Sequence, residues 1–262
     1  MNEFARSDIL AGLDAERRAT GALSAGGDAV VERSENGSDC RIVIANCPPE
    51  EIDGLICRER DSAAAGGYTL EWKHYGHDAP EDLPERLVAA GFVPADEEEV
   101  LVLALDEASL AAFDDAGRHE IKIVRDEGSL ADYAEISREI GRRNAEEERL
   151  ALALQVQAGT DEMSIHIAYA DGEPVACGRV YFRDGGTYAE LSGGRTKTAH
   201  RRQGHFTSLV ASRLRESRDR GRTHAFVDAL PTSAPILRKL GFQFVTRTRP
   251  FVFVSDSHGI DG

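Results

Sequence analysis

AELSGGRTKTAHRRQGHFTSLVASRLRESRDR, residues 189–220, predicts a strand, a short basic turn and an amphipathic helix in that order. Up to Gly194 the side chains alternate with a period of two, as in a strand. After the turn, apolar residues recur at the spacing of one helix face, namely Phe206, Leu209, Val210 and Leu214. The rest of the chain can be interpreted from this strand–turn–helix unit outward.

The turn reads RRQGHF over residues 201–206. The first N–H groups of a helix have no intrahelical acceptors, and the helix dipole adds positive charge at the same end. An anion such as phosphate binds well there, and Gly204 has no side chain to obstruct its approach to the backbone. The residues therefore indicate an anion site. An ordinary strand-to-helix turn with solvated arginines stays open as the alternative.

The pattern Arg201-x-x-Gly204 before a helix, followed by SAPILRKLGF at 233–242, resembles the GNAT superfamily of N-acetyltransferases. In that family Q/R-x-x-G-x-G/A binds the pyrophosphate of acetyl-CoA through backbone amides. Phe206 stands where the family has a small residue. The resemblance implies an α/β (α+β) fold, a GNAT-like mixed and mostly antiparallel central sheet flanked by helices, with acetyl-CoA as cofactor.

Two related domains are expected. The order of strand, helix ending in Gly-Phe, and strand occurs around Phe92 and again around Phe242. We therefore expect a degenerate GNAT-like domain at 1–117, without a cofactor, and an acetyltransferase domain at 118–262. A hairpin is predicted at Asn36-Gly37. The strand around Trp72 and His77 is interpreted as core or interface, with a site there as the less favoured alternative.

By resemblance, the cofactor would lie along the end of the strand and the turn. Two successive glycines, Gly193 and Gly194, suit a bulge or a close approach of another chain. The expected cofactor-binding residues are Gly194, Arg195, Thr196, Lys197, Thr198, Arg201, Arg202, Gln203, Gly204, His205, Phe206 and Thr207.

Glu190 is the expected general base, because the histone acetyltransferases of the family carry a catalytic glutamate on the strand leading to this turn. Asp228 is the reserve candidate. A surface role for Glu190, or a salt bridge to Arg195 or Arg179, stays open. Leu237 stands where many members have the tyrosine that acts as general acid, and Leu230 where an asparagine is usual.

The resemblance implies acetyl transfer from acetyl-CoA to a primary amine on a small molecule or peptide, and direct transfer is expected. No cysteine lies near the turn to carry the acetyl group. The alternative is a non-catalytic CoA-binding or ligand-sensing module, which the two leucine substitutions favour.

The composition of the chain argues against several other classes of function. A net charge of −15 argues against nucleic-acid and anionic-membrane binding. The four cysteines lack metal-site spacing, so no metal is expected. No apolar run has the length of a signal peptide or a membrane span, which predicts a cytoplasmic protein. Whether it forms a homodimer is left open.

Overall fold

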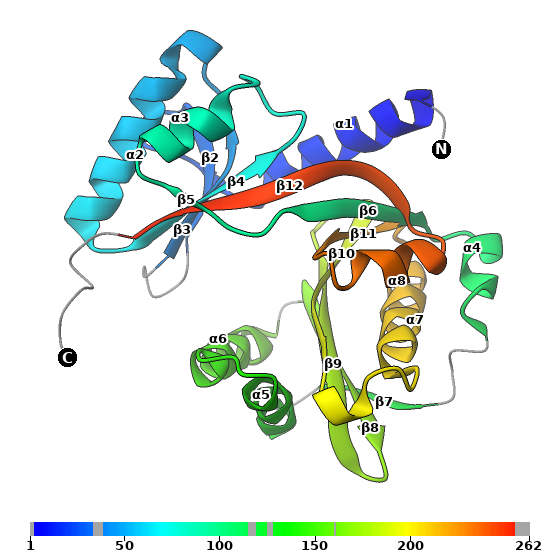
Figure 1. The fold of residues 1–262 in the computed structure, drawn as a ribbon. Helices are drawn as coiled ribbons and strands as arrows, with labels where there is room; N and C mark the ends of the chain where they lie inside the picture. Colours follow the sequence, from blue (N-terminus) through cyan, green and yellow to red (C-terminus); the bar gives the residue numbers. More distant parts are fainter. Residues whose placement is uncertain (1–2, 34–38, 115–118, 125–127, 160, 255–262) are drawn as a thin grey trace. The chain divides into compact units, whose positions relative to one another are not determined.

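The computed structural model describes residues 3–33, 39–114, 119–124, 128–159 and 161–254 (Figure 1). By contacts, the chain divides into two compact units. The first contains residues 1–100, 229–235 and 244–262, and the second contains 101–228 and 236–243. The sequence expectation placed the boundary at Gly117, which lies outside the described residues. The contact-based division falls earlier, and it assigns the last strand to the first unit.

The first unit is a sheet with helices. Its helices are α1 (Glu3–Thr20), α2 (Ile52–Gly66) and α3 (Leu83–Ala89), with the 3-10 turn η1 (Pro49–Glu51) before α2. Its strands are β1 (Ala22–Leu23), β2 (Ala29–Arg33), β3 (Asp39–Ala45), β4 (Thr69–Tyr75), β5 (Val93–Pro94) and β12 (Gln243–Phe253), and β6 (Glu98–Ala104) begins here. The strands run in the order β1-β2-β3-β4-β12, and β5 also pairs with β12.

Two strand pairings and one apolar cluster hold this unit together. β2 and β3 pair antiparallel, as expected, although the predicted Asn36-Gly37 turn lies outside the described residues. Trp72 and Leu70 of β4 are buried against Leu55 of α2. β12 pairs antiparallel with β4 over Thr248–Phe253, so a strand from the end of the chain completes a sheet built near its beginning.

The second unit contains the strand–turn–helix segment. Its helices are α4 (Glu107–Ala111), α5 (Leu130–Glu139), α6 (Ala145–Ala158), α7 (His205–Asp219) and α8 (Ala234–Lys239), which begins just before the unit boundary. Its strands are β7 (Glu120–Ile123), β8 (Met163–Ala170), β9 (Glu173–Phe182), β10 (Tyr188–Thr196) and β11 (His224–Ala229), which ends one residue past that boundary. A 3-10 turn, η3 (Thr198–His200), connects β10 to the basic turn.

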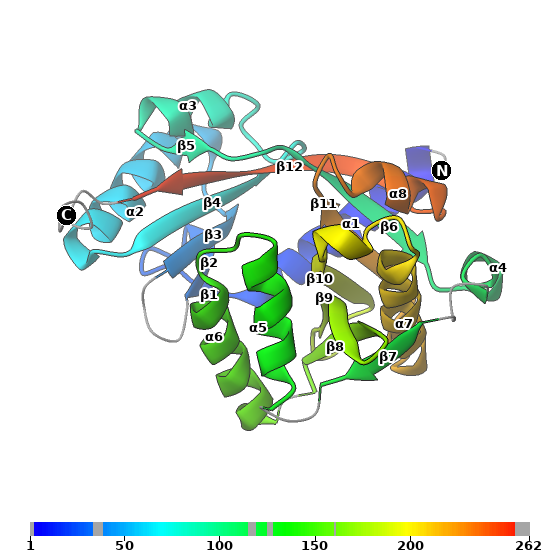
Figure 2. The same ribbon diagram turned by 60° about the horizontal axis from the view of Figure 1, so that its bottom comes forward.

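Helices cover both faces of the strands in this second unit (Figures 1 and 2). Tyr133 and Ile136 of α5 and Leu152 of α6 pack on one face, with Ile165, Ile167 and Cys177. Leu209 of α7 packs on the other face, with Ala168, Val175 and Ala176. The strands follow the order β6-β11-β10-β9-β8-β7, mostly antiparallel, with β10 and β11 parallel. The expected mixed, mostly antiparallel sheet flanked by helices is confirmed.

No helix in the described part of the chain is long and apolar enough to cross a lipid bilayer.

Candidate active site

The basic turn has the backbone of an anion site. Arg202 and Gly204 both have positive φ, 62° and 91° respectively, and α7 begins at the next residue, His205. The side chains of residues 201–204 are exposed. Within the described chain, the N–H groups of Gln203 and Gly204 have no hydrogen-bond partner. Free donors at the positive end of a fifteen-residue helix favour an anion.

His119, just before β7, determines which way the peptide between Gln203 and Gly204 faces. Its Nε2 donates to the Gln203 carbonyl at 2.9 Å. In a trans peptide the N–H points opposite to the carbonyl, so the N–H of Gly204 points away from His119. Beside it, the His119 and His205 rings lie 4.0 Å apart by centroid. Burial, together with the charges of His119 and His200, lowers the pKa of His205. His119 was not expected from the sequence, because it lies 84 residues before Gln203.

The expected bulge is present at the end of β10. The register with β9 shifts between Ser192 and Arg195, so Gly193 and Gly194 bulge out of the ladder. Gly193 has a φ of 61°, which favours glycine. A Cβ on Gly194 would lie 3.1 Å from the ring of Phe206. The large residue at the position of the family's small one therefore fits because Gly194 leaves room for it.

β10 and β11 pair only at their beginnings and separate after Glu190 and Phe226. Their parallel pairing joins Tyr188 to His224, Ala189 to Ala225 and Glu190 to Phe226. Within the described residues 188–229, no further pair joins the two strands. The edge of β10 from Leu191 onward therefore faces a gap in the ladder, where an extended ligand could form main-chain hydrogen bonds.

Two expected cofactor residues have side chains committed elsewhere. Lys197 Nζ donates to Glu135 at 2.5 Å and lies 3.4 Å from Glu139, both on α5. Arg195 is bidentate to Glu148 of α6, at 2.8 and 3.0 Å. Burial opposes the charge of Arg195, but Glu148 outweighs it and raises the pKa. These two residues therefore offer a ligand their backbone rather than their charge.

The two catalytic candidates lie on neighbouring strands of one sheet. Glu190 is on β10 and lies opposite Tyr181 of β9. Its carboxylate is 3.7 Å from the Arg183 guanidinium. Asp228 is on β11, two residues beyond Phe226, the parallel partner of Glu190. Side chains two residues apart share a face, so the structure brings both carboxylates to the same side of the sheet.

The two departures from the family pattern also have structural outcomes. Leu237 of α8 is only 2% exposed and belongs to the hydrophobic core. Leu230 is 39% exposed. Leucine has no proton to donate, so neither position supplies the general acid that a tyrosine would provide.

A buried ionic network under the bulge was missed at the sequence level. Glu148 accepts hydrogen bonds from Arg195 and from Tyr133, the latter at 3.1 Å, and forms an ion pair with Arg179 of β9 at 3.2 Å. Burial raises the pKa of Glu148, but the two guanidiniums more than offset this and leave the pKa below its ordinary value. The available signal was an arginine within the mostly apolar strand 173–182. From the sequence, Arg179 was considered only as a possible salt-bridge partner of Glu190.

Arg213 of α7 approaches the same bulge from the opposite face of the sheet. Its guanidinium donates to the carbonyls of Arg179, at 3.0 Å, and Ser192, at 3.4 Å. Gly178 leaves the space that this guanidinium fills. Complete burial lowers the pKa of Arg213 to about 10. Three arginines thus surround the bulge.

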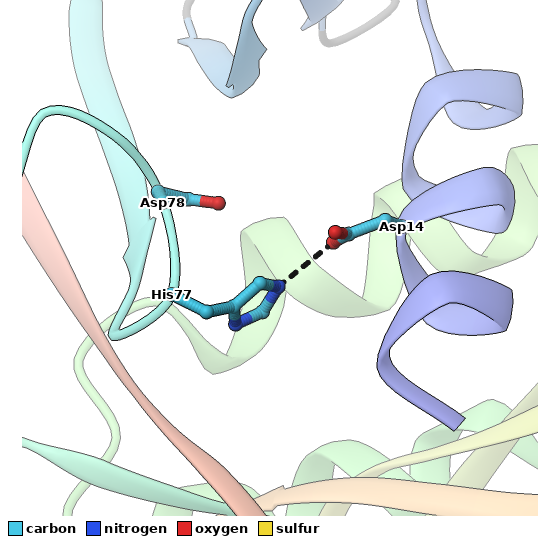
Figure 3. A group of neighbouring side chains, drawn as sticks. All are labelled: Asp14, His77 and Asp78. Atoms are coloured by element: carbon cyan, nitrogen blue, oxygen red, sulfur yellow. Dashed lines mark hydrogen bonds and ion pairs between the residues drawn. The ribbon is translucent and has the colours of Figure 1, made fainter. Parts of the chain in front are cut away.

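The first unit contains a polar cluster that resembles a metal site in composition. Ligand atoms of Asp14, His77 and Asp78 lie within 4.8 Å of one another (Figure 3). Arg17 already occupies both carboxylates, at 2.8 Å from Asp14 and 2.9 Å from Asp78. Its guanidinium also lies 3.9 Å from the Tyr75 ring centroid. The cluster is therefore explained as a buried ion-pair network that fixes α1 on the sheet.

The aromatic strand β4, considered above as a less favoured site, is largely core. Trp72 is 1% exposed and packs in the first unit's apolar cluster. His74 contacts the ring of Phe251 edge-on. Burial lowers the pKa of His74, which is consistent with a neutral packed imidazole.

Comparison with known proteins establishes the family of this site. Residues 130–242 match the model of the acetyltransferase (GNAT) family. The resemblance to the GNAT superfamily is therefore confirmed, and residues 130–242 form an acetyltransferase (GNAT) domain. No protein with a curated description matches the chain.

Solved structures extend the likeness to both halves. A GCN5-related N-acetyltransferase from Kribbella flavida is 17% identical, with a TM-score of 0.64 over 94% of this chain and 95% of that one. A tandem GNAT protein from the clavulanic acid biosynthesis pathway is 16% identical, with a TM-score of 0.59 over 86% of this chain and 77% of that one. A functionally unknown conserved protein from Staphylococcus epidermidis is 13% identical, with a TM-score of 0.62 and coverage of 84% and 85%. These likenesses show the fold.

The residues at the turn suit the diphosphate and pantetheine of CoA. The free N–H groups of Gln203 and Gly204 would hold a phosphate, with the exposed Arg201 and Arg202 beside them. Two buried polar atoms near the turn, Thr196 Oγ1 and His205 Nδ1, have no partner within the described chain. Unpartnered buried polar groups are uncommon, and a bound ligand is one way to satisfy them.

Proposed function

We propose that this protein is an acetyl-CoA-dependent N-acetyltransferase whose active copy is the second unit. The observation that carries the proposal is the turn at 201–204: its free N–H groups precede α7, beside a strand edge that β11 leaves unpaired. Phosphate at the turn and pantetheine along that edge would account for both features together.

Bound acetyl-CoA would supply an acetyl group activated as a thioester. Glu190 would accept the proton that the amine loses on its carboxylate, directly or through one water. Asp228, on the same face of the sheet, is the reserve base. The bulge at Gly193 and Gly194 would present backbone N–H groups to developing negative charge. Leu237 provides no acid, so Ser233, Tyr181, Tyr188 or water would protonate the leaving thiolate.

The acceptor is a primary amine on a small molecule or a peptide. Transfer is direct, since the cysteine of this sheet, Cys177, is buried and burial raises the pKa of its thiol to about 12. A thiol with so high a pKa is a poor nucleophile at neutral pH.

A second candidate function is a non-catalytic CoA-binding or ligand-sensing module. The buried Leu237 favours it, because an enzyme of this family would benefit from a proton donor at that position. The two candidates share CoA binding and differ in turnover with an amine.

Calorimetric titration of acetyl-CoA and CoA tests the shared step. We expect wild-type protein to bind both and Gly204→Glu to bind neither, because its carboxylate would repel the phosphate and fill the approach. Gly221→Glu is the matched control, since Gly221 also has positive φ, 77°, but follows the other end of α7. Wild-type protein that binds neither ligand would contradict both candidates. Binding without acetyl transfer to any amine would support the module.

A further inference from the structure

We propose that the acceptor amine carries a carboxylate a few bonds from its nitrogen, as an amino acid does, and that Arg179 binds this carboxylate. The inference rests on the proposed function and specifies its acceptor. Its starting point is the side of the sheet that Arg179 shares with Glu190.

Strand register places Arg179 and the candidate base together. Arg179 lies opposite Ser192, and Tyr181 lies opposite Glu190. Directly opposed residues point to the same face, and residues two apart do so as well. Arg179 and Glu190 are therefore diagonal neighbours on the face covered by α5 and α6. An amine that delivers its proton to Glu190 must approach from that face.

The guanidinium of Arg179 is held at the bulge. A Cβ built on Gly193 would lie 3.0 Å from Nη2 and 3.1 Å from Nε of this arginine. The side chain is 16% exposed, and the ring of Tyr181 lies 5.8 Å away. Glycine at 193 thus makes the space in which a flat, partly accessible cation faces the acceptor side.

Within the described chain, Arg179 has one carboxylate partner, and its guanidinium also lies over the rings of Tyr133 and Tyr181. Its one ion pair, at 3.2 Å, is with Glu148. Both oxygens of that carboxylate are already bonded to Arg195. The Nε of Arg179 is buried and has no hydrogen-bond partner within the described chain. The buried Arg213 adds a further positive charge from the other face.

An arginine whose Nε lacks an acceptor is suited to bind a carboxylate, because its planar fork matches two oxygens. The net charge of −15 describes the protein as a whole and does not determine the charge of a ligand at one site. At the bulge, two guanidiniums share one carboxylate on the acceptor face, so the local field favours an anion. An amine with a nearby carboxylate satisfies Glu190 and Arg179 at once.

The test is acetyl transfer to the standard amino acids, each compared with its own primary amide. We expect wild-type protein to prefer the acid over the amide by about 10- to 100-fold in kcat/KM, the range of a hydrogen bond to a charged group. Arg179→Met should reduce this ratio to about threefold or less through a higher KM for the acid. Arg179→Lys should restore part of it. Arg149→Met, on α6 at an arginine that pairs with Glu146, should keep the wild-type ratio.

Each other outcome is distinct. Equal use of acid and amide by wild-type protein would overturn the inference without needing a variant. An equal loss of kcat for both acceptors in Arg179→Met would assign the guanidinium to charge developing on the transferred group instead. Amines accepted only when they lack a carboxylate would overturn the inference and leave the proposed function standing. No CoA binding at all would overturn the proposed function itself. Thermal unfolding and CoA titration verify that each variant is folded.

Discussion

The ring of Phe206, in the first turn of α7, lies against the backbone of Gly194 in the bulge of β10, where an added Cβ would be 3.1 Å from the ring. The contact joins the phosphate turn to the strand that leads into it. A change at either residue should therefore be felt by the other.

Gly194→Ala should weaken CoA binding, because the methyl group would push Phe206 toward the start of α7 by a few tenths of an ångström. We expect about a three- to tenfold rise in Kd, and Phe206→Leu in the same chain should recover much of it, as contacting residues couple by about 0.5–3 kcal/mol. Calorimetry on the two single variants and the double variant measures the coupling. Gly54→Ala, at an exposed position in the first turn of α2, is the control. Additive effects would show that the contact is unimportant.

His119→Ala should also weaken CoA binding, for a different reason. Without the bond to the Gln203 carbonyl, the Gln203–Gly204 peptide can rotate and turn its N–H away from the phosphate. The net value of one hydrogen bond, about 1 kcal/mol, corresponds to about a fivefold rise in Kd. His119→Gln, which can still donate, should bind more tightly than the alanine variant. Identical affinities for all three proteins would contradict this role.

Glu190→Gln should reduce kcat by about 100-fold or more if Glu190 is the general base. CoA affinity should stay close to that of wild-type protein, because Glu190 lies on the strand before the bulge rather than in the turn. Steady-state kinetics beside Asp228→Asn compares the two candidates. Full activity in Glu190→Gln with a large loss in Asp228→Asn would exchange their roles. Equal, small losses would leave neither as the base.

Glu216 of α7 makes acid stability testable apart from activity. Burial raises the pKa of Glu216, but hydrogen bonds from His166 and Ser164 outweigh it and lower the pKa to about 2 from 4.5. A folded-state pKa below the unfolded value stabilises the protein above pH 4.5, and this stability is lost as the pH falls toward 2.

Glu216→Gln should therefore lower the free energy of unfolding at pH 7 by about 1–3 kcal/mol, and the difference from wild-type protein should shrink as the pH falls below 4.5. Urea unfolding at several pH values measures it. Glu147→Gln, on α6, is the control. A difference that persists unchanged to the lowest pH would show that the ionised carboxylate is not its source.

Local patterns were sufficient for much of the second unit. Period-two alternation predicted β10, and the pair Gly193-Gly194 predicted the bulge, because both depend on residues adjacent in sequence. The turn before α7 was predictable for the same reason. Glu190 and Asp228 were expected as a base and its reserve, and the register now puts them on one face, while their roles stay predictions.

Contacts between distant residues were beyond such patterns. The partner of Arg195 lies on α6, 47 residues earlier in the chain, and the partner of Lys197 lies on α5, 62 residues earlier. Nothing near either residue in sequence indicates that its charge is already neutralised. His119 was missed for the same reason. The role of Arg179 was missed because the sequence of its strand does not reveal that Arg179 and Arg195 share the carboxylate of Glu148.

The position of β12, the last strand of the chain, beside β4 in the first unit determines how the chain can be divided. Its hydrogen bonds to β4 span sequence separations such as the 174 residues between Thr248 and His74. A fragment ending at Gly117 would lack this strand, and the complementary fragment would expose it as an unpaired edge, which promotes aggregation. The two halves of the sequence are therefore not the two units of the structure. Expressed separately, the first half would lack β12 and the second half would carry it without its partner β4. A circularly permuted chain contains both strands, so it would preserve their pairing.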